Sequence, residues 1–203
     1  MNTDSDTATV SERLTELFDH LEIERAHVGS APIGDLVALF SARPHSVASV
    51  ALVNPTRLTA DAVGPFADRL IMFTGDQGPA ADSIAAAMPS LESVELHVAE
   101  NYDTAIWADY AADHADSILA PWLDFLARQE AKRPATALST TQDGVVAGIS
   151  YSVKGEGPAL VLFPASLAPS QWAPIADRLA EHFAVITLGG PHLGYLAVLE
   201  DRG

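Results

Sequence analysis

The chain has 203 residues, of which 48% are hydrophobic and 19% charged, and this composition predicts a globular fold and excludes a disordered or collagen-like chain. Its 27 acidic residues against 11 Lys and Arg give a formal net charge of −16, which argues against a surface that binds nucleic acid or anionic membrane. Without cysteine there is no disulfide and no thiolate metal site. The polar, acidic first residues and the lack of an apolar run of about 18 residues predict a soluble cytoplasmic protein with no membrane contact.

Apolar periodicity predicts alternating helices and strands over the first part of the chain. A helix is expected from residue 10, where Thr9 and Glu12 have the spacing of a capping box. The expected strands are 26–28, 47–53, 69–76 and 94–98, and helices are expected over 36–40, 79–88 and 118–126. Strands that alternate with helices predict a parallel sheet with right-handed crossovers.

The pattern changes near residue 128. Residues 128–135 concentrate charges and a proline, as a linker would. Asp143 and Gly144 then predict a hairpin turn that leads into a strand over 145–153. Two further apolar strands are expected at 159–163 and 184–188, with a helix between them.

Two segments carry a resemblance to a known family. Gly29-Ser-Ala-Pro-Ile-Gly34 has the form of a sharp turn between a strand and a helix, and Gly155-Glu-Gly-Pro-Ala-Leu-Val-Leu-Phe163 is followed by Gln171-Trp172. The first resembles the nucleophile elbow of the α/β-hydrolases, the superfamily of esterases and lipases. The second resembles the first parallel strand and first helix of that family, which there precede the elbow. The resemblance therefore implies a circularly permuted α/β-hydrolase-like fold, a mostly parallel sheet flanked by helices on both faces.

The resemblance also implies the organisation of the chain, a single domain over 1–203. Residues 1–127 resemble the C-terminal part of the family and 139–188 its N-terminal part, with 128–138 as linker and 189–203 as loop or tail. Residues 56–69 are too few for a helical cap. The expected sheet closes across the permutation, with 159–163 parallel and adjacent to 26–29, and with 184–188 on its other side. The rival interpretation is a piece of a longer tandem protein, because the tail resembles segments of methyltransferase fusions.

The nucleophile and oxyanion positions depart from the family pattern. An α/β-hydrolase elbow reads G-x-S-x-G, and this chain has Ala31 where the serine belongs. Ser30 lies one residue earlier and could serve only if the turn shifted. Pro164 follows the strand after which the family donates an oxyanion N–H, and proline has no N–H to donate.

The acid and histidine positions depart as well. The resemblance places the acid at Gly78, where Asp76 is the nearby substitute, and the histidine at Asn101. His97 and His114 would each need a different loop path. Loss of the nucleophile alone costs about 10⁶ in turnover, so the resemblance implies a fold without triad chemistry.

The sequence thus predicts an α/β-hydrolase-like protein that acts as a binding or scaffold module, with no cofactor and no metal site. It holds no P-loop, no Gly-x-Gly-x-x-Gly and no His-Glu-x-x-His. A small apolar ligand, a protein partner and a homodimer stay open, and Trp107 and Tyr110 could line a remnant pocket. Two alternatives stay open: a weak carboxylic-ester hydrolase that uses Ser30 with Asp76, and an accessory domain that serves a separate catalytic domain.

Overall fold

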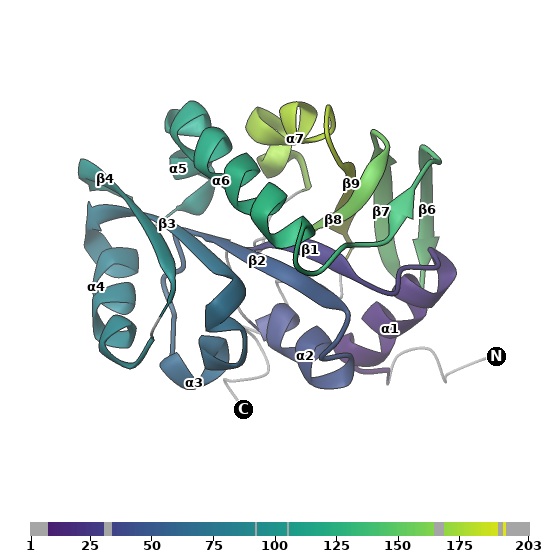
Figure 1. Cartoon of the computed structure of the whole chain (residues 1–203), viewed down its shortest axis with the longest axis horizontal. Coiled ribbons are helices and arrows are strands. Elements are labelled where there is room, and N and C mark those ends of the chain that lie inside the picture. Colours follow the sequence, from purple (N-terminus) through teal and green to yellow (C-terminus); the bar gives the residue numbers. More distant parts are fainter. Residues whose placement is uncertain are drawn as a thin grey trace.

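The computed structural model describes residues 8–30, 34–91, 93–104, 106–164, 169–190 and 193. Within these residues a nine-stranded mixed sheet forms the centre, with helices on both of its faces (Figure 1). The strand order is β4-β3-β2-β1-β8-β9-β7-β6, and β5 pairs with β8 off this path. The predicted α/β class, with a mostly parallel sheet between helices, is confirmed.

The first half of the chain supplies one side of the sheet. Its strands are β1 (Ala26–Ser30), β2 (Val47–Val53), β3 (Leu70–Gln77) and β4 (Glu95–Asp103). Its helices are α1 (Val10–His20), α2 (Gly34–Ala42), α3 (Ala60–Val63), η1 (Gly64–Arg69), α4 (Gly78–Ala87), η2 (Met88–Ser90), α5 (Trp107–Asp113) and α6 (Ala115–Glu130). All three strand pairs from β1 to β4 are parallel.

The second half supplies the other side. Its elements are β5 (Ala137–Leu138), β6 (Gln142–Val146), β7 (Ile149–Lys154), β8 (Gly157–Leu162), η3 (Pro169–Trp172), α7 (Ala173–Leu179) and β9 (Ala184–Gly189). β8 and β9 are parallel, whereas β7 is antiparallel to both β9 and β6.

The hairpin turn between β6 and β7 lies later than the sequence predicted. Asp143 and Gly144 lie inside β6, paired with Ser152 and Tyr151. The turn is instead made by Ala147 and Gly148, whose φ angles are 50° and 78°, the left-handed conformation that tight hairpins require. Gly144 is needed for a different reason, since a Cβ there would lie 2.7 Å from the Tyr151 hydroxyl.

Both halves of the chain meet in the middle of this sheet. Val28 of β1 pairs in parallel with Val161 of β8, and Leu162 pairs in parallel with Thr187 of β9. The expected closure, with 159–163 beside 26–29 and 184–188 on its other side, is confirmed. Every residue of β1 and β2 is buried, as expected for strands that have neighbours on both edges and helices on both faces.

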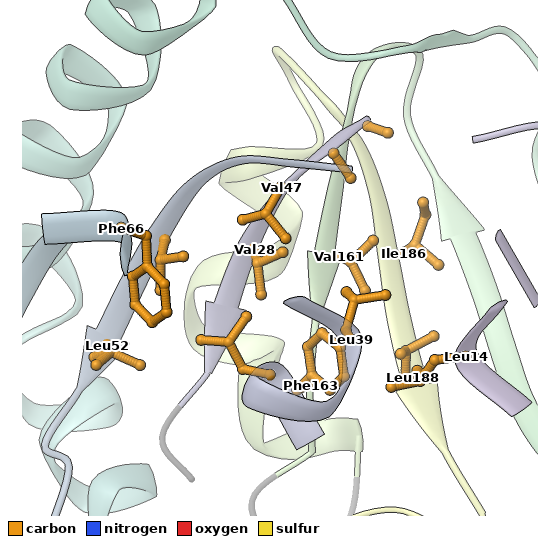
Figure 2. Close-up of a cluster of buried hydrophobic side chains, with 14 of the residues drawn as sticks. Leu14, Val28, Leu39, Val47, Leu52, Phe66, Val161, Phe163, Ile186 and Leu188 are labelled. Atoms are coloured by element: carbon orange, nitrogen blue, oxygen red, sulfur yellow. The ribbon is translucent and has the colours of Figure 1, made fainter. Parts of the chain in front are cut away.

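Two apolar cores lie on the two faces of the sheet. Figure 2 shows part of the first, where Val28, Val161 and Ile186 from three adjacent strands pack with Leu14 of α1 and Leu39 of α2. The second core lies beneath α5, α6 and α7 on the opposite face. No helix in the described part of the chain is both long and apolar enough to cross a membrane.

Candidate functional site

The sheet changes its winding between β1 and β8. These strands are parallel neighbours, yet the helices that follow them cover opposite faces (Figure 1). After β1, α2 contributes Leu36 and Leu39 to the first core, whereas after β8, α7 contributes Ile175 and Leu179 to the second. In open α/β sheets ligands bind outside the carboxyl ends of the strands at such a switch point. The carboxyl ends of β1 and β8 are therefore the candidate site.

Two of the predicted site residues lie at these strand ends. Ser30 is the last residue of β1, pairs with Leu52 of β2, and is fully buried. Pro164 is buried directly after Phe163, whose N–H donates to the carbonyl of Gly29 at 2.9 Å. The structure therefore brings the nucleophile and oxyanion segments together, although Ala31 lies outside the described residues.

The acid and histidine positions lie at the carboxyl ends of β3 and β4, which stay paired to their last residues. Gly75 pairs with Ala99 and Gln77 with Asp103, so that residues 100–102 form a bulge opposite Asp76. Asn101 adopts a left-handed φ of 56° within this bulge. The loop expected beyond the strand is thus replaced by an extension of β4 that includes Asn101.

Asp76 and Asn101 are bonded to each other. One carboxylate oxygen of Asp76 accepts the Asn101 N–H at 2.9 Å and the other accepts the Tyr102 N–H at 3.0 Å. These two backbone hydrogen bonds hold the pKa of the Asp76 carboxyl below its ordinary value. The side chain that could replace the catalytic acid therefore satisfies the backbone of the bulge.

The backbone conformation and the neighbouring Asp103 side chain favour glycine at position 78. Its φ is 82°, and a Cβ there would lie 2.0 Å from Oδ1 of Asp103. A side chain at this position would be strained by the left-handed φ and would collide with Asp103. An acid at Gly78 would have to adopt this left-handed φ and displace the Asp103 carboxylate.

The candidate histidines lie in or beside β4, and the buried Nε2 of His114 has no hydrogen-bond partner among the described residues. His97 lies within β4, where its Nε2 is 3.0 Å from a Glu95 carboxylate oxygen. His114 lies between α5 and α6, with ring centroids 4.4 Å from Tyr102 and 4.9 Å from Tyr110. Both rings therefore pack near β4, which is three strands away from β1 in the sheet order.

Three tryptophans pack on one face of the sheet near the switch point, and we call them the tryptophan cluster: Trp107, Trp122 and Trp172. The ring centroids of Trp107 and Trp172 are 4.5 Å apart, and those of Trp122 and Trp172 are 6.1 Å apart. A Cβ on Gly29, near the end of β1, would lie 2.7 Å from the Trp122 ring. The Trp172 indole N–H donates to the carbonyl of Phe163 at the end of β8.

Several buried polar atoms in the cluster and next to it have no hydrogen-bond partner among the described residues. Nε1 of Trp107, Nε1 of Trp122 and Oε1 of Gln171 are buried and have no hydrogen-bond partner among the described residues. Buried polar side-chain atoms are normally paired, as the N–H of Trp172 is. Two indole donors and an amide acceptor therefore lie unsatisfied beside the candidate site.

Asn54 joins the end of β2 to the chain just before α5, a role that the sequence did not predict for this residue. Its side-chain amide donates to the Thr104 carbonyl at 3.0 Å, and its backbone N–H donates to the Phe73 carbonyl at 2.7 Å. It thereby fixes the chain before α5 across the end of β2, just ahead of Trp107. The sequence signal was an asparagine at a strand end, and its left-handed φ of 50° fits that residue type.

The described residues contain no group of three His, Asp or Glu side chains that could hold a metal ion. A scan against known protein families, a search of curated proteins and a search of solved structures each found no match.

Proposed function

We propose that this chain is a circularly permuted, capless α/β-hydrolase-like protein that has lost the catalytic triad and binds a small apolar ligand at the carboxyl ends of β1 and β8. The observation that carries the loss of catalysis is the pairing of Asp76 with Asn101. The binding role rests on the tryptophan cluster at the switch point.

Strand order supports the permuted fold. The strands that resemble the nucleophile, next, acid and histidine strands of the family are β1, β2, β3 and β4, and they follow one another across the sheet. The hairpin β6–β7, which resembles the opening of the family, forms the opposite edge. The segment over 56–69 folds as α3 and η1, which supports a capless form.

Three separate features argue against triad chemistry. Ala31 offers no nucleophile. Asp76 and Asn101 are held in the bulge, and Pro164 has no N–H for an oxyanion. Nucleophile, base and oxyanion donor act as a unit in catalysis, so their combined loss leaves binding as the retained property of the site.

The tryptophan cluster supports a ligand of defined chemistry. Its rings form an apolar environment that is buried beneath α5, α6 and α7, and the N–H groups of Trp107 and Trp122 are donors within it that lack a partner among the described residues. A compact apolar molecule with a carbonyl acceptor, such as an uncharged acyl ester, matches both features.

Calorimetric titration with methyl octanoate tests this binding. We expect saturable binding that Trp107→Phe weakens by about tenfold, because phenylalanine keeps a ring but removes the donor. Tyr151→Phe, on the distant strand β7, is the matched control and should bind like the wild type. Absence of saturable binding, or equal binding by Trp107→Phe, would contradict the ligand site.

The alternative is a weak ester hydrolase that uses Ser30. A fluorophosphonate probe followed by mass spectrometry distinguishes it, because only an activated serine is labelled. Labelling at Ser30 would favour the enzyme, and an unlabelled chain favours the binding module. The accessory-domain alternative would be favoured if the chain binds the ester without hydrolysing it and binds it more tightly when a separate catalytic domain is present.

A further inference from the structure

Three arginines meet at the amino ends of the parallel strands, at the opposite end of these strands from the candidate site. Arg25 directly precedes β1, Arg69 directly precedes β3, and Arg133 lies in the segment after α6. We call them the arginine cluster. The chain has only 11 Lys and Arg among 203 residues and a net charge of −16, so this local concentration of cations runs against its overall charge.

Contacts of the segment over 131–136 hold the cluster together. Arg25 donates from Nε to the His45 carbonyl at 3.0 Å and from Nη1 to the Pro134 carbonyl at 3.5 Å. Arg133, the residue before Pro134, donates from Nη1 to Gln129 at 3.2 Å and from Nη2 to Asp68. Asp68 is the residue before Arg69, so the three arginines share one neighbourhood.

Arg69 is the member of the cluster whose buried Nε lacks a hydrogen-bond partner among the described residues. Its guanidinium carbon lies 5.5 Å from the centroid of the Phe40 ring, and its buried Nε has no hydrogen-bond partner among the described residues. Burial lowers the pKa of Arg69, the charge of Asp68 raises it, and the charges of Arg133 and Arg25 lower it. Arg69 is therefore a cation near two other cations, and the adjacent carboxylate of Asp68 is already bonded to Arg133.

The segment that carries Arg133 is firmly anchored. The Thr136 N–H donates to the Arg25 carbonyl at 2.8 Å, and the Thr136 hydroxyl oxygen accepts the backbone N–H groups of Glu24 and Arg25. The Ala159 N–H of β8 donates to the Thr136 carbonyl at 2.8 Å. The backbone that carries Arg25 and Arg133 is thus fixed at the amino ends of the strands. This reduces the conformational entropy that is lost when a ligand binds.

We propose that Arg25, Arg69 and Arg133 form a binding site for the phosphate group of a small molecule. Guanidinium groups from three separate segments can address three oxygens of a tetrahedral anion, whereas a carboxylate offers two. The Asp68 carboxylate would compete with phosphate for Arg133, since the two side chains already form an ion pair. The site lies apart from the candidate site at the carboxyl ends of β1 and β8 and does not depend on its function.

Calorimetric titration with inorganic phosphate and with pyrophosphate at constant ionic strength tests the proposal on the whole chain. Arg69→Gln should weaken phosphate binding by about tenfold to hundredfold, because it removes the charged donor. Asp68→Asn should strengthen binding, because it releases Arg133 without removing a donor. Arg178→Gln is the matched control, since Arg178 pairs with Asp116 on the surface between α6 and α7.

Each outcome bears on the proposal. Loss of binding in Arg69→Gln, a gain in Asp68→Asn and no change in Arg178→Gln support the phosphate site. Wild-type binding no tighter than that of Arg69→Gln, or an equal loss in Arg178→Gln, would overturn it. Acetate that binds as tightly as phosphate would overturn the preference for phosphate. If Arg69→Gln does not fold, as judged by circular dichroism, Arg133→Gln takes its place. Arg133→Gln should then weaken phosphate binding, whereas Asp68→Asn should strengthen it.

Discussion

The Asp76 carboxylate accepts the backbone N–H of Asn101 at 2.9 Å, which joins the residue that could replace a catalytic acid to the position where the histidine would stand. A second oxygen of Asp76 accepts the N–H of Tyr102, so both carboxylate oxygens serve the bulge in β4. Asp76, the substitute for the expected acid, and Asn101, the expected histidine position, therefore hold β3 and β4 together at the edge of the sheet.

Asp76→Ala should lower the melting temperature, because two backbone N–H groups lose their acceptor. Asp124→Ala, an exposed position within α6, is the control and should change it little. The pKa of Asp76 is lowered from its ordinary value of 3.8, so its contribution is full above about pH 3.8 and is lost as the pH falls through the lower folded value. The two variants should therefore differ at pH 7 and converge in acid. Equal melting temperatures at pH 7 would show that Asp76 is not structural.

Leu162→Ala should destabilise the fold by about 2–5 kcal/mol, because this fully buried side chain lies in a central strand and its loss leaves a cavity. Ser30→Ala removes one hydroxyl and should cost far less. Chemical denaturation measures both. A larger loss for Ser30→Ala than for Leu162→Ala would contradict the central position of β8.

Gly29→Ala should destabilise the fold by about 1–3 kcal/mol through overpacking. The added methyl would lie 2.7 Å from both Leu162 and the Trp122 ring. The double variant Gly29→Ala with Leu162→Ala should be less destabilised than the sum of the two single variants, because the cavity accommodates the methyl. Strictly additive losses would show that Trp122 alone sets the close approach at Gly29.

His27 predicts a pH dependence of stability. It is fully buried, with Nδ1 2.7 Å from the Ser49 hydroxyl and Nε2 2.9 Å from the Glu130 carboxylate. Burial lowers the pKa of His27 from its ordinary value of 6.5, an effect that Glu130 partly opposes. A lowered folded pKa means that the contribution of His27 is full above about pH 6.5 and declines as the pH falls toward the folded value.

Urea denaturation at pH 7.5, 6.5 and 5.5 measures this dependence. The wild type should lose more stability across this range than His27→Gln, which cannot take up a proton. His182→Gln, at an exposed position, is the control and should keep the wild-type slope. A wild-type slope in His27→Gln would assign the loss to other groups.

The sequence predicted the centre of the fold better than its edges. The adjacency of β1, β8 and β9 was predicted from the strand order that the resemblance implies, and the apolar runs of β8 and β9 indicated strands inside a sheet that is covered on both faces. The hairpin turn was placed wrongly because Asp143-Gly144 is a strong local turn signal, whereas Gly144 lies within β6 as the cross-strand partner of Tyr151. The extension of β4 through Asn101 depends on Asp76, 25 residues earlier, and periodicity within one strand does not report such a bond.

The two candidate sites also differ in how far the sequence alone could reveal them. Motif spacing led to the carboxyl ends of the strands because the elbow and the oxyanion segment are each local in sequence. The tryptophan cluster gathers residues from α5, α6 and η3, and the arginine cluster gathers residues that precede β1 and β3 or follow α6. No local pattern marks such sets, since only the fold brings their members together.

Hydrolysis of a p-nitrophenyl acyl ester tests the central claim most directly. With Ala31 at the elbow, Asn101 at the histidine position and Pro164 at the oxyanion position, turnover by the wild type should stay within about tenfold of an inert protein at equal concentration. Ala31→Ser should not raise it, because a serine hydroxyl without a base is a poor nucleophile at neutral pH. Saturable turnover by the wild type that Ser30→Ala abolishes would contradict this account and identify a working hydrolase with a shifted elbow.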